Sequence, residues 1–376
     1  MLIFGWASAS AQNMDDLNLQ IHGYATQGFL FTTHNNIFTT NSSDGSPAWT
    51  TAVINISAQP TPKLHIAVQG RYSLLGNYGN AIVMDWAAID YKVNDSFGVR
   101  FGKVKTPWGL FNEVQDIDPA YIWALLPQSI YPTTSSNSIL AHYGGIVYGT
   151  LKLGPKLGKL DYRGWGGEGF YGTDDGYFIN QAEAGFNLPN GIQGTLFGAA
   201  LHWKTPLPGL MVGVSGLKDN RWTAAYTGNH GAITGTQTLA PNTQPNYFAL
   251  YEKNKLTVAY EYSRSWGNAL TRFSGTPESS LRNDDRGWYA MASYKLTPKL
   301  TAGFYESQND DHQAPLGPER YQKDFAISGR YDFNAFLYAK AEQHFIYGTG
   351  LGFDNTLNPS LKPNTLLAAL KLGVSF

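Results

Sequence analysis

The 376-residue chain contains no cysteine, and only 15% of its residues are charged. The absence of cysteine excludes a disulfide scaffold and thiolate metal sites, and it suits a compartment in which free thiols would be oxidised. No uncharged apolar run reaches the length of about 20 residues that a membrane-spanning helix needs. The formal net charge of −1 gives no electrostatic reason to expect a nucleic-acid partner. The composition therefore argues against helical membrane proteins and nucleic-acid-binding proteins.

The chain is instead rich in glycine and in aromatic residues, with 41 glycines, 20 phenylalanines, 23 tyrosines and 10 tryptophans. Small and aromatic side chains in such numbers favour strands over helices. The 43% hydrophobic content is too high for a disordered chain. An all-β protein is therefore the first expectation.

The N-terminus begins with an apolar stub that ends in Ala9-Ser10-Ala11. Small residues in this arrangement are typical of the cleavage site of a secretory signal, although a basic segment ahead of the apolar run is missing. We predict that residues 1–11 are the remnant of such a signal and that residues 12–376 form a single barrel domain outside the cytoplasm. The alternative is that the stub forms a first strand.

Polar and apolar residues alternate along the whole chain, as they do in a strand whose successive side chains point to opposite faces. In residues 63–72, for example, Leu64, Ile66 and Val68 share one face and Gln69 lies on the other. Most alternating segments contain about ten residues, the length of a tilted strand that crosses a bilayer. Sixteen such segments are predicted, at residues 19–31, 50–59, 63–74, 81–93, 97–105, 142–153, 159–169, 194–204, 209–217, 246–252, 255–266, 286–296, 299–308, 322–333, 335–346 and 365–376.

The links between these segments alternate in length. Residues 60–62, 94–96 and 253–254 are examples of short links made of turn residues, whereas every second link is longer and rich in Gly, Ser, Asn, Asp and Pro. Strict alternation over an even number of strands is typical of bacterial outer-membrane barrels, which have short periplasmic turns and long extracellular loops. We therefore predict an antiparallel transmembrane β-barrel of about 16 strands.

A soluble β-sandwich or propeller would also show alternation. Nearly every segment here has an apolar outward face, however, which would be exposed to water unless lipid covered it. Segments 81–93, 97–105 and 246–252 fit the alternation poorly. In the first of them, Asp85 and Asp90 have opposite parity. Both carboxylates face the lumen only if a β-bulge lies between them.

The longest link, residues 106–141, far exceeds the ordinary loop length of about 4 to 6 residues, which indicates a function. Asp118 is placed as a helix N-cap, Pro119 as the first helical residue and Pro127 as the stop, so we expect a short apolar helix here. Because its apolar side chains need a dry wall, the loop is expected to fold into the barrel as a constriction loop. The alternative is packing on the outer rim or on a neighbouring subunit.

The passage from the fifth segment into this loop, residues 97–113, reads FGVRFGKVKTPWGLFNE. It resembles the strand-to-loop passage of the phosphate-selective and dicarboxylate-type porin superfamily, in which an Arg-x-Gly-x-x-Lys-x-Pro-x-Gly-Leu run leads into the constriction loop. The downstream run from Leu126 to Tyr131 is similar to members of the broader group, and the terminal Phe376 resembles the recognition signal for barrel assembly. The resemblance implies a trimeric outer-membrane channel that passes small solutes, often anions.

Five charged residues are the candidates for the pore constriction. Arg71, Arg100 and Lys105 are placed on the wall, and Glu113 and Asp116 on the loop. A basic wall that faces an acidic loop would create a transverse field that orients dipolar solutes. For any single residue, a role in solvating the lumen or in cross-strand pairing is the simpler interpretation.

These observations predict a porin in the bacterial outer membrane of a Gram-negative cell. It would allow passive diffusion of small hydrophilic, mainly anionic, solutes. Its expected partners are those solutes and outer-membrane lipid and lipopolysaccharide. The resemblance alone implies two further copies in a homotrimer. No enzymatic activity, cofactor or metal is expected, because none of the eight histidines lies in a recognisable catalytic or helical metal-binding motif. The alternative function is a structural or adhesive surface barrel with a closed lumen.

Overall fold

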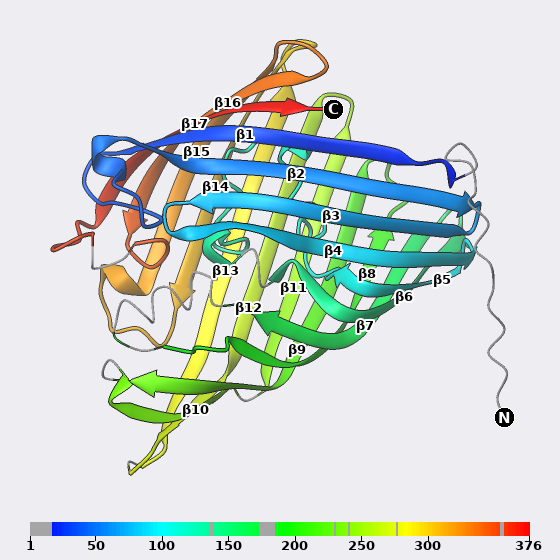
Figure 1. Ribbon diagram of the computed structural model, residues 1–376. Coiled ribbons are helices and arrows are strands. Elements are labelled where there is room, and N and C mark those ends of the chain that lie inside the picture. Colours follow the sequence, from blue (N-terminus) through cyan, green and yellow to red (C-terminus); the bar gives the residue numbers. More distant parts are fainter. Residues whose placement is uncertain are drawn as a thin grey trace, which may run out of the picture.

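The protein forms a closed antiparallel β-barrel, in which β1 pairs with both β2 and β17 (Figure 1). The computed structural model describes residues 17–135, 139–172, 185, 187–228, 231–239, 241–275, 277–353 and 357–376. The predicted signal remnant, residues 1–11, lies outside them. The all-β fold class is confirmed, and sixteen strands surround the barrel.

The elements follow one another along the chain as antiparallel neighbours in the sheet, with short 3-10 turns in the links. The strands are β1 (Gln20–Thr32), β2 (Ser46–Thr61), β3 (Leu64–Leu75), β4 (Tyr78–Asn94), β5 (Phe97–Lys105), β6 (Ala141–Gly154), β7 (Gly158–Tyr171), β8 (Ile192–Lys204), β9 (Leu210–Gly228), β10 (Ile233–Leu239), β11 (Asn242–Lys253), β12 (Leu256–Phe273), β13 (Ser279–Lys295), β14 (Leu300–Asp311), β15 (Tyr321–Asp332), β16 (Leu337–Gly348) and β17 (Asn364–Ser375). The 3-10 turns are η2 (Ser42–Asp44), η3 (Asp118–Ala120), η4 (Thr133–Ser135) and η6 (Pro318–Arg320).

β10 and β11 are two pieces of one interrupted strand. Both lie between β9 and β12, and β10 pairs with the distal ends of these neighbours while β11 pairs with the parts nearer the barrel. Pro241 stands at the interruption, where its missing N–H and fixed φ break the ladder. The strands of this region extend beyond the rest of the rim (Figure 1).

Each predicted segment corresponds to one strand of the barrel wall, and β5 has the predicted bounds. The main differences lie on the side of the long links, where β9, β12 and β13 continue well past the predicted ends. The link between β3 and β4 is a tight turn at Gly76 and Asn77 instead of a longer loop. A Cβ at Gly76 would stand 2.2 Å from the carbonyl oxygen of Phe38, so the loop after β1 packs directly on this turn.

A β-bulge lies in β4 where the two carboxylates required one. Gln69 pairs with Trp86 and the next residue, Gly70, pairs with Met84, so Asp85 is the extra residue. As a result both Asp85 and Asp90 point inward, although their parity differs. Asp85 meets Arg71 on β3, and Asp90 meets an arginine on β5.

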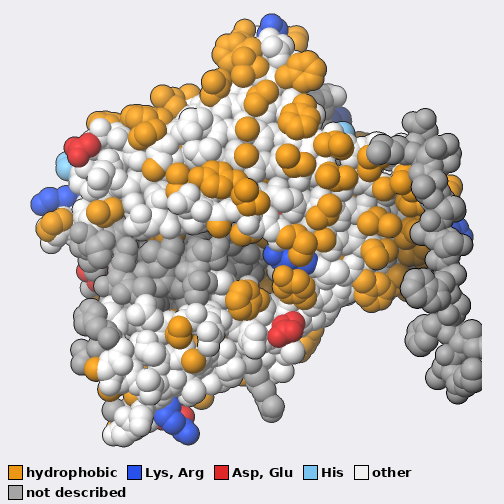
Figure 2. Space-filling view, in the orientation of Figure 1, with side chains coloured by type: hydrophobic (Ala, Val, Ile, Leu, Met, Phe, Trp, Pro, Cys, Tyr) orange, Lys and Arg blue, Asp and Glu red, His pale blue; other side chains and the backbone are white. Residues whose placement is uncertain are grey.

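The outer wall is apolar and the inner wall is polar. Figure 2 shows hydrophobic side chains spread over the outside of the barrel, and residues such as Ile54, Phe101 and Leu370 are more than half exposed. Inward-facing Glu261 and Lys340, by contrast, are buried. A closed barrel with such a wall suits a bacterial outer membrane, because lipid covers the apolar face and every strand has two partners. Among the described residues, no helix has the length and apolar character of a membrane span.

The predicted helix after Asp118 is wrong. The structure has the single turn η3, and bends and turns follow it. The N-cap of η3 is Ile117, and no side chain caps it. The Asp118 carboxylate instead binds Lys340 and Lys371 on the wall. Two ammonium groups stabilise the carboxylate more than a backbone N–H would, so the predicted cap does not form.

Candidate pore constriction

The link between β5 and β6, residues 106–140, crosses the inside of the barrel. The Gly109 N–H donates to Ser215 Oγ on β9 over 2.9 Å. Further along, Ser129 Oγ donates to the Trp288 carbonyl on β13 over 3.0 Å, and the loop also bonds to side chains of β15, β16 and β17. Because these strands lie on different sides of the barrel, the loop spans the lumen and does not lie on its outer rim.

The first anchor of the loop is a tight approach to β12. Gly109 has a φ of +67°, and a Cβ there would stand 2.6 Å from Tyr131 Oη and 2.7 Å from Glu261 Oε1. Glycine is therefore required both for the backbone conformation and for the space.

Glu261 on β12 is completely buried and accepts hydrogen bonds from several donors. Its Oε1 accepts from the Leu110 N–H at 2.8 Å, from Tyr131 Oη at 2.7 Å and from Asn246 Nδ2 at 2.7 Å, and its Oε2 accepts from Tyr289 Oη. Burial and the neighbouring Glu261 carboxylate raise the pKa of the loop residue Tyr131 well above its usual value, so its hydroxyl remains a donor. This set of bonds fixes the start of the loop to the wall.

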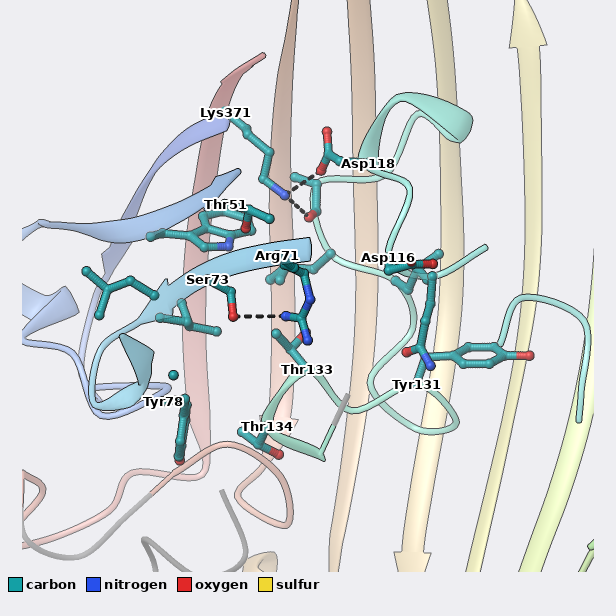
Figure 3. Close-up of a pocket in the computed structure, with 18 of the residues that line it drawn as sticks. Thr51, Arg71, Ser73, Tyr78, Asp116, Asp118, Tyr131, Thr133, Thr134 and Lys371 are labelled. Atoms are coloured by element: carbon teal, nitrogen blue, oxygen red, sulfur yellow. Dashed lines mark hydrogen bonds and ion pairs between the residues drawn. The ribbon is translucent and has the colours of Figure 1, made fainter. Parts of the chain in front are cut away.

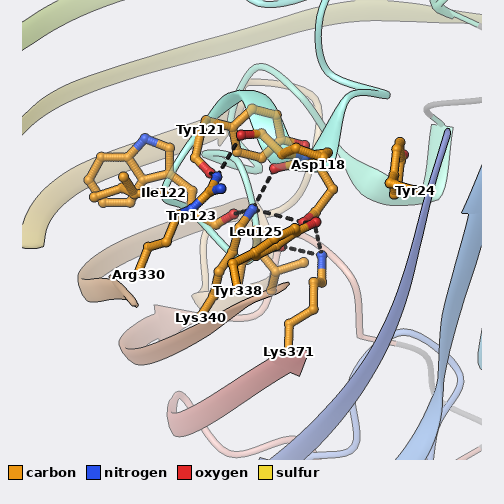
Figure 4. Close-up of polar contacts among 12 residues, drawn as sticks. Tyr24, Asp118, Tyr121, Ile122, Trp123, Leu125, Arg330, Tyr338, Lys340 and Lys371 are labelled. Carbon is orange, nitrogen blue, oxygen red and sulfur yellow. Dashed lines mark hydrogen bonds and ion pairs between the residues drawn. The ribbon is translucent and has the colours of Figure 1, made fainter. Parts of the chain in front are cut away.

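The second anchor joins Asp118 to β16 and β17 (Figure 4). The Asp118 carboxylate lies 3.0 Å from Lys340 Nζ and 2.7 Å from Lys371 Nζ, and it accepts from Tyr338 Oη at 2.7 Å. Burial alone would raise its pKa, but Lys340 and Lys371 outweigh burial and hold the pKa of Asp118 well below its usual range. The carboxylate is therefore ionised and triply held.

The same strands also satisfy the irregular backbone of the loop. Lys340 Nζ donates to the Trp123 carbonyl and Lys371 Nζ to the Ala124 carbonyl, each at 2.9 Å. The two carboxylate oxygens of Glu342 accept from the N–H groups of Ala124 and Leu125, each at 3.1 Å. Buried backbone groups that lack helical partners need such bonds. The wall therefore supplies what a helix would have supplied internally.

Three of the predicted constriction residues take part in a buried cluster beside β3 and β4. Arg71 Nε lies 2.8 Å from Asp85 Oδ1, and Lys105 Nζ lies 2.7 Å from Asp116 Oδ1. Gln69 donates to both Asp85 and Asp116 and so links the two pairs. None of the four charged side chains is more than 10% exposed. Figure 3 shows Arg71 and Asp116 at a cavity of about 120 Å³ between the loop and this wall.

The other two predicted residues belong to a charged group that water reaches. Glu113 Oε2 lies 3.3 Å from Arg163 Nη1 on β7, and Glu113 Oε1 lies 3.7 Å from Arg100 Nη1 on β5. These three side chains are 29 to 32% exposed. Behind them, Asp90 accepts from Arg100 Nε at 2.8 Å and from the Tyr148 hydroxyl. A single loop carboxylate thus stands between two wall guanidinium groups.

The sequence placed Arg100 and Lys105 on the wall and Glu113 and Asp116 on the loop, without assigning pairs. In the structure Arg100 lies beside Glu113, and Lys105 lies beside Asp116. Arg163 was not among the five candidates. The alternation along β7 puts it on the inner face, but only the path of the loop shows that it meets Glu113. A role of the five candidates in selectivity stays a prediction.

Comparisons with known proteins rest on the fold. No family model and no curated protein matches the chain. Among solved structures, OmpF of Salmonella typhi in complex with daunomycin is 14% identical, with a TM-score of 0.59 over 97% of this chain and 99% of that one.

Two further matches have similar scores. The anion-selective porin from Comamonas acidovorans is 8% identical, with a TM-score of 0.56 over 95% of this chain and 99% of that one. The trimer form of OmpT from Vibrio cholerae is 14% identical, with a TM-score of 0.54 over 95% of this chain and 99% of that one. At these identities the likeness concerns the fold, which is the barrel of outer-membrane porins.

Proposed function

We propose that the chain forms a water-filled channel for passive diffusion of small hydrophilic solutes across the outer membrane, without catalysis. Barrels of about sixteen strands are wide enough for an aqueous channel, and here one long loop narrows the lumen. The observation that carries the proposal is the partly exposed charged group of Arg100, Glu113 and Arg163. Charged side chains that water reaches inside a barrel whose outer wall is apolar would line a path for ions.

We further propose that anions pass more easily than cations. Two guanidinium groups and one carboxylate are exposed to a similar extent, while Asp90 behind them is only 14% exposed. The carboxylates therefore neutralise the two guanidinium charges only in part on the side that water reaches, and the remaining positive charge would favour anions at this point. The resemblance of residues 97–113 to the phosphate-selective and dicarboxylate-type porins supports the same direction, as does the barrel shared with the anion-selective porin.

We also propose a homotrimer embedded in outer-membrane lipid and lipopolysaccharide. Support comes from the resemblance in sequence and from the trimer form of the OmpT structure. Mass measurement in mild detergent over a range of protein concentrations tests this assembly. Recovery of monomer alone at every concentration would remove it.

Ion permeability of the purified protein in a planar bilayer tests the channel itself. Discrete conductance steps, with a reversal potential under a KCl gradient that shows Cl⁻ to be more permeable than K⁺, are the expected result. A barrel of the correct fold that shows no conductance would instead support the structural or adhesive alternative.

A further inference from the structure

A larger cavity, of about 580 Å³, lies on the other side of the loop from the cavity in Figure 3. It is bounded by the loop and by residues of the strands from β7 to β14. Its lining includes Leu239 at the end of β10 and Asp311 at the end of β14, so it lies toward the side of the long links. The ion pairs that hold the loop in place do not fill this space.

The lining of this cavity is largely apolar and aromatic. Trp108 from the loop, Tyr171 from β7 and Trp222 from β9 contribute rings, and several leucines complete the surface. The indole N–H of Trp222 is buried and has no hydrogen-bond partner among the described residues. An apolar solute body would pack against these rings.

Three carboxylates line the same cavity without an ion pair within 4.0 Å among the described residues. They are Asp219 on β9, Asp285 on β13 and Asp311 on β14. Asp285 and Asp311 stand directly opposite each other across the two strands. Like charges in this position repel each other and destabilise the sheet. A bound cation would offset this repulsion.

The neighbouring acids show that the missing partners are particular to the cavity. Asp284 and Asp310 also stand at this end of β13 and β14 but do not line it. Asp284 Oδ1 lies 2.7 Å from Arg264 Nε, and Asp310 Oδ1 lies 2.8 Å from Arg320 Nε. Arg282 is the one basic residue in the described lining, against three carboxylates.

We propose that this cavity is a binding site for a small organic cation: a primary ammonium group carried on an aromatic or branched aliphatic body. The ammonium group binds between Asp285 and Asp311, and the apolar body packs on Trp222 and the leucines. Size, ring surface and unpaired negative charge are all required for this ligand class and occur together only here among the described cavities. The proposal goes beyond the channel function, because binding does not depend on conductance.

Calorimetric titration of the detergent-solubilised full chain with phenethylammonium chloride tests the site. Three comparators each lack one feature or reverse it: ethylammonium lacks the ring, 2-phenylethanol lacks the charge, and phenylacetate has the opposite charge. Phenethylammonium is expected to bind at least about tenfold more tightly than each of them, as a charged hydrogen bond or a buried ring would provide. Equal or tighter binding of phenylacetate would overturn the proposal without any variant.

Variants test the position of the site. The double variant Asp285→Asn/Asp311→Asn should bind phenethylammonium roughly tenfold more weakly, whereas Asp310→Asn, outside the cavity, should bind it as the unchanged protein does. Equal affinity in the double variant would refute the site. Binding of phenethylammonium without conductance would refute the proposed channel and support this site. Conductance without binding would support the channel and refute this site.

Discussion

Replacement of Glu113 by glutamine would remove the loop's negative charge from between Arg100 and Arg163 and keep the shape of the side chain. The carboxylate oxygens lie 3.3 and 3.7 Å from the two guanidinium groups. At about 4 Å, two unit charges interact by about 1 kcal/mol in water and about 4 kcal/mol at an effective dielectric of 20. Because the three side chains are about 30% exposed, the lower figure is the appropriate one. About 1 kcal/mol corresponds to roughly a fivefold change in a ratio.

The expected result for Glu113→Gln is therefore a Cl⁻ to K⁺ permeability ratio about fivefold higher than that of the unchanged protein. The assay is the reversal potential of a planar bilayer under a KCl gradient. Low salt is essential, because the screening length falls from about 10 Å at 0.1 M to about 3 Å at 1 M. The double variant Arg100→Gln/Arg163→Gln should shift the ratio toward K⁺.

A matched control is Glu278→Gln. Glu278 also pairs with an arginine, Arg272, but it lies in the exposed link between β12 and β13. This variant should leave the reversal potential unchanged. If Glu113→Gln and the double arginine variant also leave it unchanged, ions do not pass this group and the proposed constriction is wrong.

Three further predictions concern the anchors of the loop. Lys340→Met removes one partner of the buried Asp118 and should lower the stability of the loop by about 3 kcal/mol. The expected sign is increased current noise in single-channel recordings. Noise at the level of the unchanged protein would show that this anchor is dispensable. Glu261→Gln replaces the carboxylate that accepts from the tyrosine and amide donors with a weaker acceptor that also donates. The free energy of unfolding in urea of the detergent-solubilised barrel is expected to fall by about 2 kcal/mol. An unchanged unfolding midpoint would contradict this prediction. The pKa of Asp118 is lowered in the folded state, so the stability that its ion pairs contribute is present above the ordinary aspartate pKa and is lost only as pH falls through the lower folded pKa. Current noise should therefore be the same at pH 7 and pH 5. An increase in noise at pH 5 would refute the assignment.

The barrel wall could be predicted from the sequence because each strand carries its own signal. Alternation identifies a strand and its outward face, and links of alternating length give its direction. Parity showed only that Asp85 and Asp90 could both face inward if a bulge lay between them, and the structure contains that bulge at Asp85. The strands that protrude beyond the rim were missed at their distal ends. There the alternation no longer separates lipid from water, so the pattern does not show where a strand stops.

The loop could be predicted only in part. Its length and its apolar middle indicated a position inside the barrel, and Asp118 and Pro119 suggested a helix from local preferences alone. Those preferences were overridden by partners on distant strands, because Lys340, Lys371 and Glu342 are more than 200 residues away along the chain and satisfy the loop's backbone and carboxylate. No local pattern contains such partners.

The charges of the lumen show why an inventory of inward-facing residues does not by itself predict selectivity. Parity placed Arg71 and Arg100 on the same inner wall with equal weight. In the structure Arg71 is shielded by Asp85 beneath the loop, whereas Arg100 pairs with the less exposed Asp90 and shares Glu113 with Arg163 where water enters. Ions respond to charges that are exposed and incompletely neutralised. Neutralising Arg71 should therefore affect the stability of the loop more than the reversal potential, and the reverse should hold for Arg100.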